Sequence, residues 1–236
     1  MIMKITDSFL ENIKHCECVI FDLDGTLINT IDDLGLACDF ILKEQGIDPC
    51  WTNEDYKKFV GNGARLLVKR AFDNKLSEKE LDELYARFKV KYNEIKLDHA
   101  HAYDGIKQVV GLLKDSGRKL VVCTNKPDVA AKGMVEAIFG KKAFDVVQGA
   151  VDGKPTKPDP TISQEILSNL GINPKNTVWI GDSDVDIISA RNLGCESIAV
   201  AWGFRSVDSL LKERPGALIY SPKDILKIFN LDIDNR

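Results

Sequence analysis

The alternation of apolar strand-like runs with helix-like runs along the second half of the chain constrains the fold more than any other sequence feature. After Asp104, the apolar runs are rich in β-branched residues and read "RKLVVCTN", "FDVVQGA", "NTVWIGDS" and "ESIAVAW". The segments between them carry apolar residues at helical spacing. Buried strands separated by helices are typical of a parallel sheet covered on both faces. The sequence therefore predicts an α/β fold with a Rossmann-like, doubly wound parallel sheet.

The first half contributes one strand and then a long helical region. The run "CVIFDL" has the character of a buried strand, and a short helix is expected before it over residues 5–15. From Thr30 to about residue 100 the apolar residues recur three and four apart, and Ser77 with Glu80 matches a capping box. We therefore predict a discontinuous α/β core of residues 1–28 and 102–236, interrupted by an all-α cap domain of residues 29–101.

Charge and hydropathy exclude several classes of partner. The 36 acidic and 32 basic side chains give a net charge of −4, so no basic excess favours nucleic acid. The sequence shows neither a long apolar run typical of a membrane span nor a signal-peptide pattern. We expect a cytoplasmic protein, a monomer or weak homodimer, with no nucleic-acid or membrane partner.

Polar residues gather at the predicted carboxyl ends of the strands. In an open parallel sheet, the loops that follow the strands converge at one edge, and ligands bind there. The first strand is followed by two carboxylates, and other polar or charged side chains follow three later segments. The residues concerned are Asp22 and Asp24, then Thr124, Asn125 and Lys126, then Lys154 and Lys157, and finally Asp182, Asp184 and Asp186.

The chemistry of these groups points to a phosphate site. Carboxylates held close together repel one another, which raises some of their pKa values or requires a cation between them. Oxygen ligands suit Mg²⁺, which usually takes one or two carboxylates and keeps other positions for water and phosphate. Lysine and hydroxyl donors complement the oxygens of a phosphoryl group. The sequence therefore predicts Mg²⁺ as cofactor and a site for a phosphoryl group.

Four short motifs in order resemble those of the haloacid dehalogenase superfamily. They are "DLDGT", the strand-end "TN", "KPDP" and "GDSDVD", and the helical segment after the first is similar to the inserted helical cap of that family. "VGNGA" and "TNKP" most resemble its phosphoglycolate phosphatase branch. The resemblance covers nearly the whole chain from residue 17 onward. It implies a Mg²⁺-dependent phosphomonoester hydrolase that acts through an aspartyl-phosphate on a small, phosphoglycolate-like metabolite.

The resemblance assigns roles to the first motif. Asp22 matches the nucleophile, which attacks phosphorus. Asp24 matches the general acid, which protonates the leaving alkoxide and later takes a proton from the hydrolytic water. In relatives the backbone carbonyl of Asp24 is also a metal ligand. Gly25 permits a tight turn, and the adjacent backbone N–H groups can bind an anion.

The second and third motifs supply phosphate ligands by the same resemblance. Thr124 would donate to a phosphoryl oxygen, and Asn125 beside it belongs to the expected substrate-binding set. Lys157 would neutralise charge on both the nucleophile and the phosphate. We prefer Lys157 to Lys154 because the prolines of "KPDP" restrict its loop and the family pattern places lysine before proline.

The fourth motif completes the expected metal site. Asp182 would coordinate Mg²⁺ directly. Asp186 lies four residues on, on the same helical face, where it can hold a metal-bound water or orient Lys157. The expected metal residues are therefore Asp22, Asp24, Asp182 and Asp186. Asp184 is interpreted as a solvated residue of the first helical turn.

Selectivity is expected from the cap, because the core motifs contact only the phosphoryl group. The candidate segment is "VGNGAR", residues 60–65, in which the glycines allow a close approach of the backbone. Gly63 precedes a helix start that offers free N–H groups to an anion. Arg65 could pair with a second negative group such as the carboxylate of phosphoglycolate, although a surface arginine on an amphipathic helix fits the pattern equally well.

Three other functions share this pattern. A sugar-phosphate mutase would hand the phosphoryl group from the aspartate to a sugar hydroxyl, and a pyrophosphatase would use the same core chemistry. A non-catalytic phosphate-binding regulator would keep the fold alone. "TNK" after the second strand favours the hydrolase by family likeness, and the full set of catalytic residues argues against the regulator.

Overall fold

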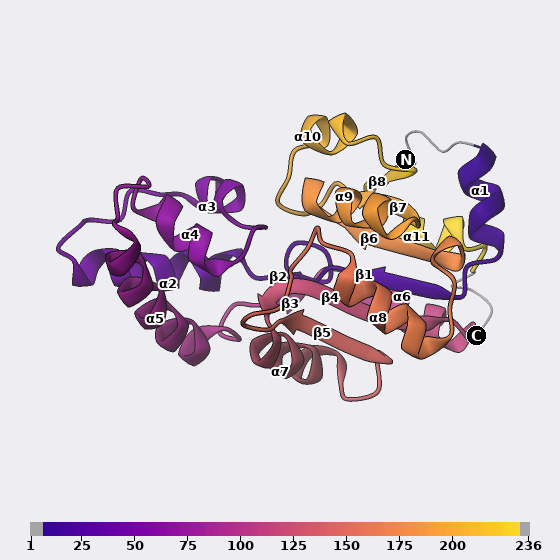
Figure 1. Ribbon diagram of the computed structural model, residues 1–236, viewed down its shortest axis with the longest axis horizontal. Coiled ribbons are helices and arrows are strands. Elements are labelled where there is room, and N and C mark those ends of the chain that lie inside the picture. The colour runs from indigo at the N-terminus through magenta and orange to yellow at the C-terminus, as the bar shows by residue number, and fades with distance from the viewer. Residues whose placement is uncertain (1–6, 232–236) are drawn as a thin grey trace.

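A six-stranded parallel sheet forms the core of the protein, which is described here as a computed structural model covering residues 7–231 (Figure 1). The order β5-β4-β1-β6-β7-β8 places the first strand at the centre. The strands are β1 (Cys18–Phe21), β4 (Lys119–Pro127), β5 (Val146–Ala150), β6 (Thr177–Gly181), β7 (Glu196–Val200) and β8 (Ala217–Ile219). This topology confirms the predicted α/β class. The outermost parts of the predicted core, and the start of the helix expected from residue 5, lie outside the described residues.

Alternation along β1 explains why both faces of the sheet are covered. Val19 and Phe21 point to one face, and Cys18 and Ile20 point to the other. The first face packs against α1 (Asp7–Lys14), α6 (Ile106–Asp115), α7 (Asp128–Phe139) and α11 (Pro222–Ile228). The second packs against α8 (Thr161–Leu170), α9 (Asp184–Leu193) and α10 (Val207–Lys212). Each strand is therefore apolar on both sides, as the continuous apolar runs predict.

A bundle of four helices interrupts the core after the first strand. The helices are α2 (Ile31–Glu44), α3 (Asn53–Phe59), α4 (Ala64–Ala71) and α5 (Glu78–Ile95), and we call residues 31–95 the helical insert. The bundle has an apolar core of its own, which includes Ile41, Leu67 and Phe88. The capping box expected at the start of α5 forms between Ser77 and Glu80. In Figure 1 the helical insert lies beyond the carboxyl ends of the sheet strands.

The helical insert enters and leaves the core at one place. Strands β2 (Ile28–Asn29) and β3 (His101–Ala102) pair antiparallel, so the two connections run side by side. On the core side, Phe204 from the loop after β7 packs into the apolar cluster of the insert. Within residues 7–231, no helix combines the length and apolar character needed to cross a membrane.

Candidate active site

The carboxyl ends of the three central strands bring the candidate residues together. Asp22 follows β1, Thr124 lies in the second half of β4, and Asp182 follows β6. These strands are neighbours in the order β4-β1-β6. All three side chains line one cavity between the sheet and the helical insert. About 960 Å³ of unfilled space lies within it, part of which is continuous with the solvent. A small molecule can therefore reach these side chains from solvent.

Lys157 lies between two carboxylates at the bottom of this cavity. Its Nζ is 2.8 Å from Asp22 Oδ1 and 2.8 Å from Asp186 Oδ1. The lysine is 9% exposed, and it comes from the loop before α8. The competing Lys154 is exposed and is not in contact with this cluster. The structure thus brings Lys157, and not Lys154, to the predicted nucleophile.

Asn125 holds the backbone of Lys157 from the neighbouring strand. Its Oδ1 accepts from the Lys157 N–H at 2.9 Å, and its Nδ2 donates to the Lys157 carbonyl at 3.1 Å. Nδ2 also lies 3.3 Å from the Gly61 carbonyl of the helical insert. The amide lines the cavity, so Asn125 both fixes the lysine loop and borders the substrate space.

Asp186 is held by its own helix start and by the core. Its Oδ2 accepts from the Ser183 hydroxyl at 2.6 Å and from the Ser183 N–H at 3.2 Å, which completes a capping box on α9. Its Oδ1 accepts from Lys157 at 2.8 Å and from the Trp179 indole at 3.3 Å. Because four donors already use both oxygens, the carboxylate is better placed to orient Lys157 than to bind a cation directly.

Asp182 is held tightly by backbone and by small residues. The Thr26 hydroxyl donates to its Oδ1 at 3.1 Å, and the Phe204 N–H donates to its Oδ2 at 2.7 Å. A Cβ at Gly25 would lie 2.3 Å from Oδ2, and a Cβ at Gly203 would lie 2.2 Å from the Asp182 Cβ. Glycine is therefore needed at both positions for the carboxylate to sit where it does.

Burial and mutual repulsion shape the charges of the site. Burial raises the pKa of Asp22 to about 6 and the pKa of Asp182 to about 8, and neighbouring carboxylates add to both rises. Burial alone would lower the pKa of Lys157, but Asp186 and Asp22 outweigh it, so this pKa lies above its usual value. The lysine stays charged, while the carboxylates favour a second positive charge beside them.

The donor set fits a divalent cation. One oxygen from each of Asp22, Asp182 and Asp186 lies within 4.8 Å of the others. Asp22 Oδ1 is buried and accepts no well-aligned hydrogen bond, although Lys157 forms an ion pair with it. Because four donors already use Asp186, the buried carboxylates of Asp22 and Asp182 are the ones placed to bind such a cation, and oxygen ligands of this kind suit divalent cations. The side chain of Asp24 lies outside this group, so of the four expected metal residues it could contribute only its backbone carbonyl.

Asp24 instead belongs to a second cluster that the sequence did not reveal. Lys126 Nζ donates to Asp24 Oδ1 at 2.9 Å and Oδ2 at 3.1 Å, and the Thr30 hydroxyl donates to Oδ1 at 2.8 Å. Lys126 also donates to the Tyr92 hydroxyl of α5 at 2.6 Å. The sequence offers Lys126 only as a strand-end residue of "TNKP", and nothing in that pattern places it against Asp24.

The helical insert supplies the wall of the cavity opposite Asp22, Thr124 and Lys157. Its contribution is mostly apolar or small, with one exposed lysine, Lys89, at the opening. Gly63, at the start of α4, lines the cavity as expected. The insert residues on this wall are Leu34, Val60, Gly61, Gly63, Ala64, Leu67, Phe88, Lys89, Tyr92 and Asn93.

The structure does not bring Arg65 into the cavity. Its Nε and Nη2 donate to Asp82 at 2.9 and 2.8 Å, and Nη2 donates to Glu78 at 2.8 Å. Both partners lie on α5, so the guanidinium joins two helices of the insert. The expected pairing of Arg65 with a second negative group of the substrate has no geometric support, because two carboxylates already occupy the side chain.

A different arginine links the core to the insert at the cavity. Arg205, in the loop after β7, lines the cavity and donates Nη1 to the Lys57 carbonyl at 2.6 Å. Its Nη2 donates to the Val60 carbonyl, and its Nε lies 3.4 Å from Asp184 Oδ1. Asp184 is 42% exposed, so the first-turn position expected for it also carries a partner. Sequence reasoning missed Arg205 because no motif surrounds it.

Comparisons with known proteins agree with this geometry. Residues 19–200 match the family model of the haloacid dehalogenase-like hydrolases. Phosphoglycolate phosphatase from Chromobacterium violaceum is 32% identical over 203 residues, which cover 84% of this chain and 91% of that relative. The enzyme of that name from Agrobacterium fabrum is 33% identical over 191 residues, covering 80% and 82%.

A solved structure extends the likeness to the whole fold. The crystal structure of a protein from Lactobacillus delbrueckii subsp. bulgaricus superposes on this chain with a TM-score of 0.85 and 30% sequence identity. The match covers 90% of this chain and 98% of that protein. The likeness therefore includes the helical insert as well as the sheet. With the four motifs converging at one sheet edge, the chain belongs to the haloacid dehalogenase-like hydrolase family.

Proposed function

We propose that this protein is a Mg²⁺-dependent phosphomonoester hydrolase with Asp22 as its nucleophile. The observation that carries the proposal is the position of Lys157 Nζ, 2.8 Å from both Asp22 and Asp186, at the bottom of a cavity that Thr124 also lines. The lysine ammonium and the hydroxyl donor complement the oxygens of a bound phosphoryl group, and the acidic cluster beside them could hold the cation that such a group also binds. Mg²⁺, held by Asp22, Asp182 and the backbone carbonyl of Asp24, would neutralise charge on the phosphoryl oxygens.

The first half of the reaction transfers the phosphoryl group to the protein. An Asp22 oxygen attacks phosphorus and forms an aspartyl-phosphate, while the bond from phosphorus to the leaving oxygen breaks. For this step Asp24 must carry a proton, which it gives to that oxygen, so that an alcohol departs and Asp24 is left as the carboxylate that accepts from Lys126. Lys157 and the Thr124 hydroxyl hold the phosphoryl oxygens in line for attack.

The second half returns the protein to its starting state. Asp24, now a carboxylate, takes a proton from a water molecule as that water attacks phosphorus. The bond between phosphorus and the Asp22 oxygen breaks, and inorganic phosphate leaves. Asp186 acts only through Lys157, because its oxygens are already used by Ser183, Trp179 and the lysine.

The proposed substrate is phosphoglycolate or a similar small phosphate ester. Support comes from the curated relatives named phosphoglycolate phosphatase, which match over 80% or more of this chain. We further propose that the helical insert acts as a cap, which excludes water from the aspartyl-phosphate and presents its cavity wall to the rest of the substrate. Support for this role is that Val60, Gly63 and Leu67 of the insert line the same cavity as Asp22.

Phosphate release from a panel of substrates tests the proposal. The panel contains p-nitrophenyl phosphate, phosphoglycolate, a hexose phosphate and pyrophosphate, each assayed with Mg²⁺ and with EDTA. We expect Mg²⁺-dependent release, highest for phosphoglycolate, and no turnover by Asp22→Asn. Faster release from pyrophosphate, or isomerisation of the hexose phosphate without release, would assign the site to the related pyrophosphatase or mutase reactions.

A further inference from the structure

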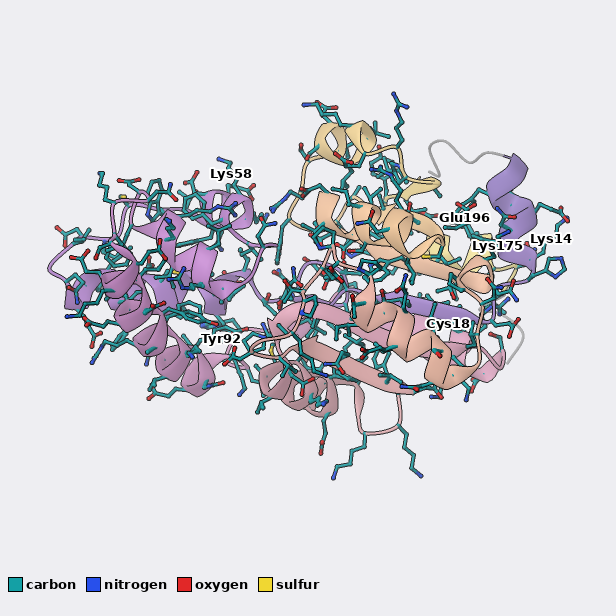
Figure 2. The ribbon with its side chains drawn as sticks, in the orientation of Figure 1. Lys14, Cys18, Lys58, Tyr92, Lys175 and Glu196 are labelled. Carbon is teal, nitrogen blue, oxygen red and sulfur yellow. The ribbon has the colours of Figure 1, made fainter. Side chains whose placement is uncertain are left out.

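A buried contact joins the helical insert to the residue that would move the proton. Tyr92 of α5 is 5% exposed, and its hydroxyl accepts from Lys126 Nζ at 2.6 Å and donates to Met134 Sδ at 3.7 Å. Met134 belongs to α7 of the core, so the phenol is inserted between two core side chains. Figure 2 shows Tyr92 at the junction of the insert with the core.

Lys126 forms hydrogen bonds both to the core and to the helical insert. Its side chain is 2% exposed, and its ammonium donates to both oxygens of Asp24 as well as to Tyr92. The ammonium also lies 4.6 Å from the centre of the Tyr92 ring, which adds a cation–π contact. A buried ammonium needs acceptors, because leaving its charge without partners is costly. Removing the insert from the core would therefore change the surroundings of Lys126 and, through it, of Asp24.

Each of the two buried lysines of the site pairs with a different aspartate of the first motif. Lys157 contacts Asp22, and the Asn125 amide of the core fixes its backbone. Lys126 contacts Asp24, and one of its acceptors comes from the insert. Attack on phosphorus thus uses a lysine whose ammonium contacts only core carboxylates, although the Asn125 amide that fixes its backbone also donates to the Gly61 carbonyl of the insert. Proton transfer uses an aspartate whose lysine donates directly to a side chain of the insert.

We propose that Lys126 and Tyr92 are positioning residues that couple seating of the helical insert to the orientation of the Asp24 carboxyl group. With the insert seated, Asp24 is held by Lys126 and Thr30 where it faces the cavity. When the insert withdraws, Tyr92 leaves, and Asp24 loses this fixed orientation. The inference rests on the proposed function, because it needs Asp24 to exchange a proton with the leaving group.

The test uses leaving groups that differ in their need for a proton. An alkyl phosphate such as phosphoglycolate releases a strongly basic alkoxide, whereas p-nitrophenyl phosphate releases a weakly basic phenolate. Tyr92→Phe removes one hydroxyl and keeps the ring. We expect kcat for the alkyl phosphate to fall roughly ten-fold, while kcat for the aryl phosphate stays within about two-fold of the parent. KM should change little for either substrate.

A matched control comes from the same helix. Tyr85 lies two turns earlier on α5, and the Nζ of Lys89 on the same helix lies 4.8 Å from the centre of its ring. Tyr85→Phe should leave both kcat values unchanged. Lys126→Met should reproduce the selective loss more strongly, and Lys126→Met with Tyr92→Phe should be no worse than Lys126→Met alone, because residues acting as one unit are not additive.

Two results would overturn the inference. One is an equal loss of kcat on the alkyl and aryl phosphates in Tyr92→Phe, which would mean that the hydroxyl serves only stability. The other is an equal loss of kcat on both substrates in Lys126→Met, which would mean that the lysine binds the phosphoryl group. Thermal unfolding by circular dichroism confirms that each variant is folded, and Tyr92→Phe keeps the test valid if Lys126→Met is not. Asp24→Asn, measured in parallel, distinguishes failure of the proposed acid role of Asp24 from failure of the coupling through Tyr92. If it lacks the same leaving-group dependence, the proposed role of Asp24 fails; if only Tyr92→Phe lacks it, the coupling alone fails.

Discussion

The ammonium of Lys157 and the carboxylate of Asp186 form a buried ion pair in which Nζ lies 2.8 Å from Oδ1. The position of Asp186 is fixed independently by Ser183, through the capping box at the start of α9. The geometry of the lysine therefore depends on a helix start as well as on its own loop. A change at Asp186 should act on the phosphoryl group through Lys157.

Asp186→Asn should lower kcat/KM for p-nitrophenyl phosphate by roughly 10- to 100-fold, as removal of a residue that orients a ligand does elsewhere. The amide keeps the shape of the carboxylate but loses the charge that holds Lys157. Asp184→Asn, two residues earlier, is the control and should cost less than about five-fold, because its pair with Arg205 is partly exposed. A larger loss at Asp184 would show that the assignment of the fourth motif is shifted by two residues.

Stability of the metal-free protein should fall as pH rises. The pKa of Asp182 is raised from 3.8 to about 8, and that of Asp22 to about 6, so the folded state holds protons that the unfolded state has lost. The stability linked to these protons is present below about pH 4 and is lost as pH rises through about 6 and 8.

Mg²⁺ should reverse this loss, because it binds the deprotonated carboxylates. The increase in Tm on adding Mg²⁺ should therefore be larger at about pH 8 than at about pH 5. Thermal unfolding with Mg²⁺ and with EDTA measures the difference, and Asp182→Asn should remove most of it. An equal increase at both pH values would contradict the assignment of the cation to these carboxylates.

Gly25→Ala should remove Mg²⁺-dependent activity. The new Cβ would lie 2.3 Å from Asp182 Oδ2, in a residue whose φ is +84°. Gly117→Ala is a matched control, since Gly117 also has a φ of +84° but nothing lies within 4 Å of its added Cβ. Both variants should lose about 1–2 kcal/mol of unfolding free energy from backbone strain, measured in urea, and Gly25→Ala should lose more because its Cβ overlaps Asp182. Only Gly25→Ala should change the Mg²⁺ requirement. The same requirement in both variants would mean that Asp182 tolerates displacement.

Arg205→Met should raise KM more than Arg65→Met does. Arg205 joins the core to the carbonyls of Lys57 and Val60 beside the cavity, whereas Arg65 joins α4 to α5 within the insert. We expect roughly a ten-fold rise for phosphoglycolate in Arg205→Met, from lost hydrogen bonds of a charged group, and less than about two-fold in Arg65→Met. A stronger effect of Arg65→Met would restore the sequence-based view that Arg65 contacts the substrate.

The sheet and the residues at its strand ends follow from the sequence because both depend on short-range pattern. Apolar alternation identifies the strands, and parallel topology then requires their carboxyl ends to meet at one edge. Asp22, Thr124 and Asp182 could be brought together on this basis before any coordinates were known. The choice of Lys157 over Lys154 rested on the two prolines of "KPDP" and on the family pattern that the segment resembles.

Contacts between elements far apart in sequence could not be predicted in the same way. The pairing of Arg65 with Glu78 and Asp82 depends on how α4 crosses α5, which periodicity does not define. The meeting of Lys126 with Tyr92 depends on how the insert rests on the core. Periodicity says which face of each helix is apolar, but it says nothing about which face of the core the helix will reach.

The antiparallel pair of β2 and β3 lies where the chain passes from the catalytic core into the helical insert and back again. Ile28 pairs with Ala102 and Asn29 with His101, so a segment can be exchanged there without altering the order of the catalytic strands. If an insert of another length were grafted there, the core would keep Asp22, Lys157 and Asp182 in place. The grafted insert would still need to supply its own equivalent of the Tyr92 hydroxyl, which makes α5 the part of any such chimera that must be matched to its host.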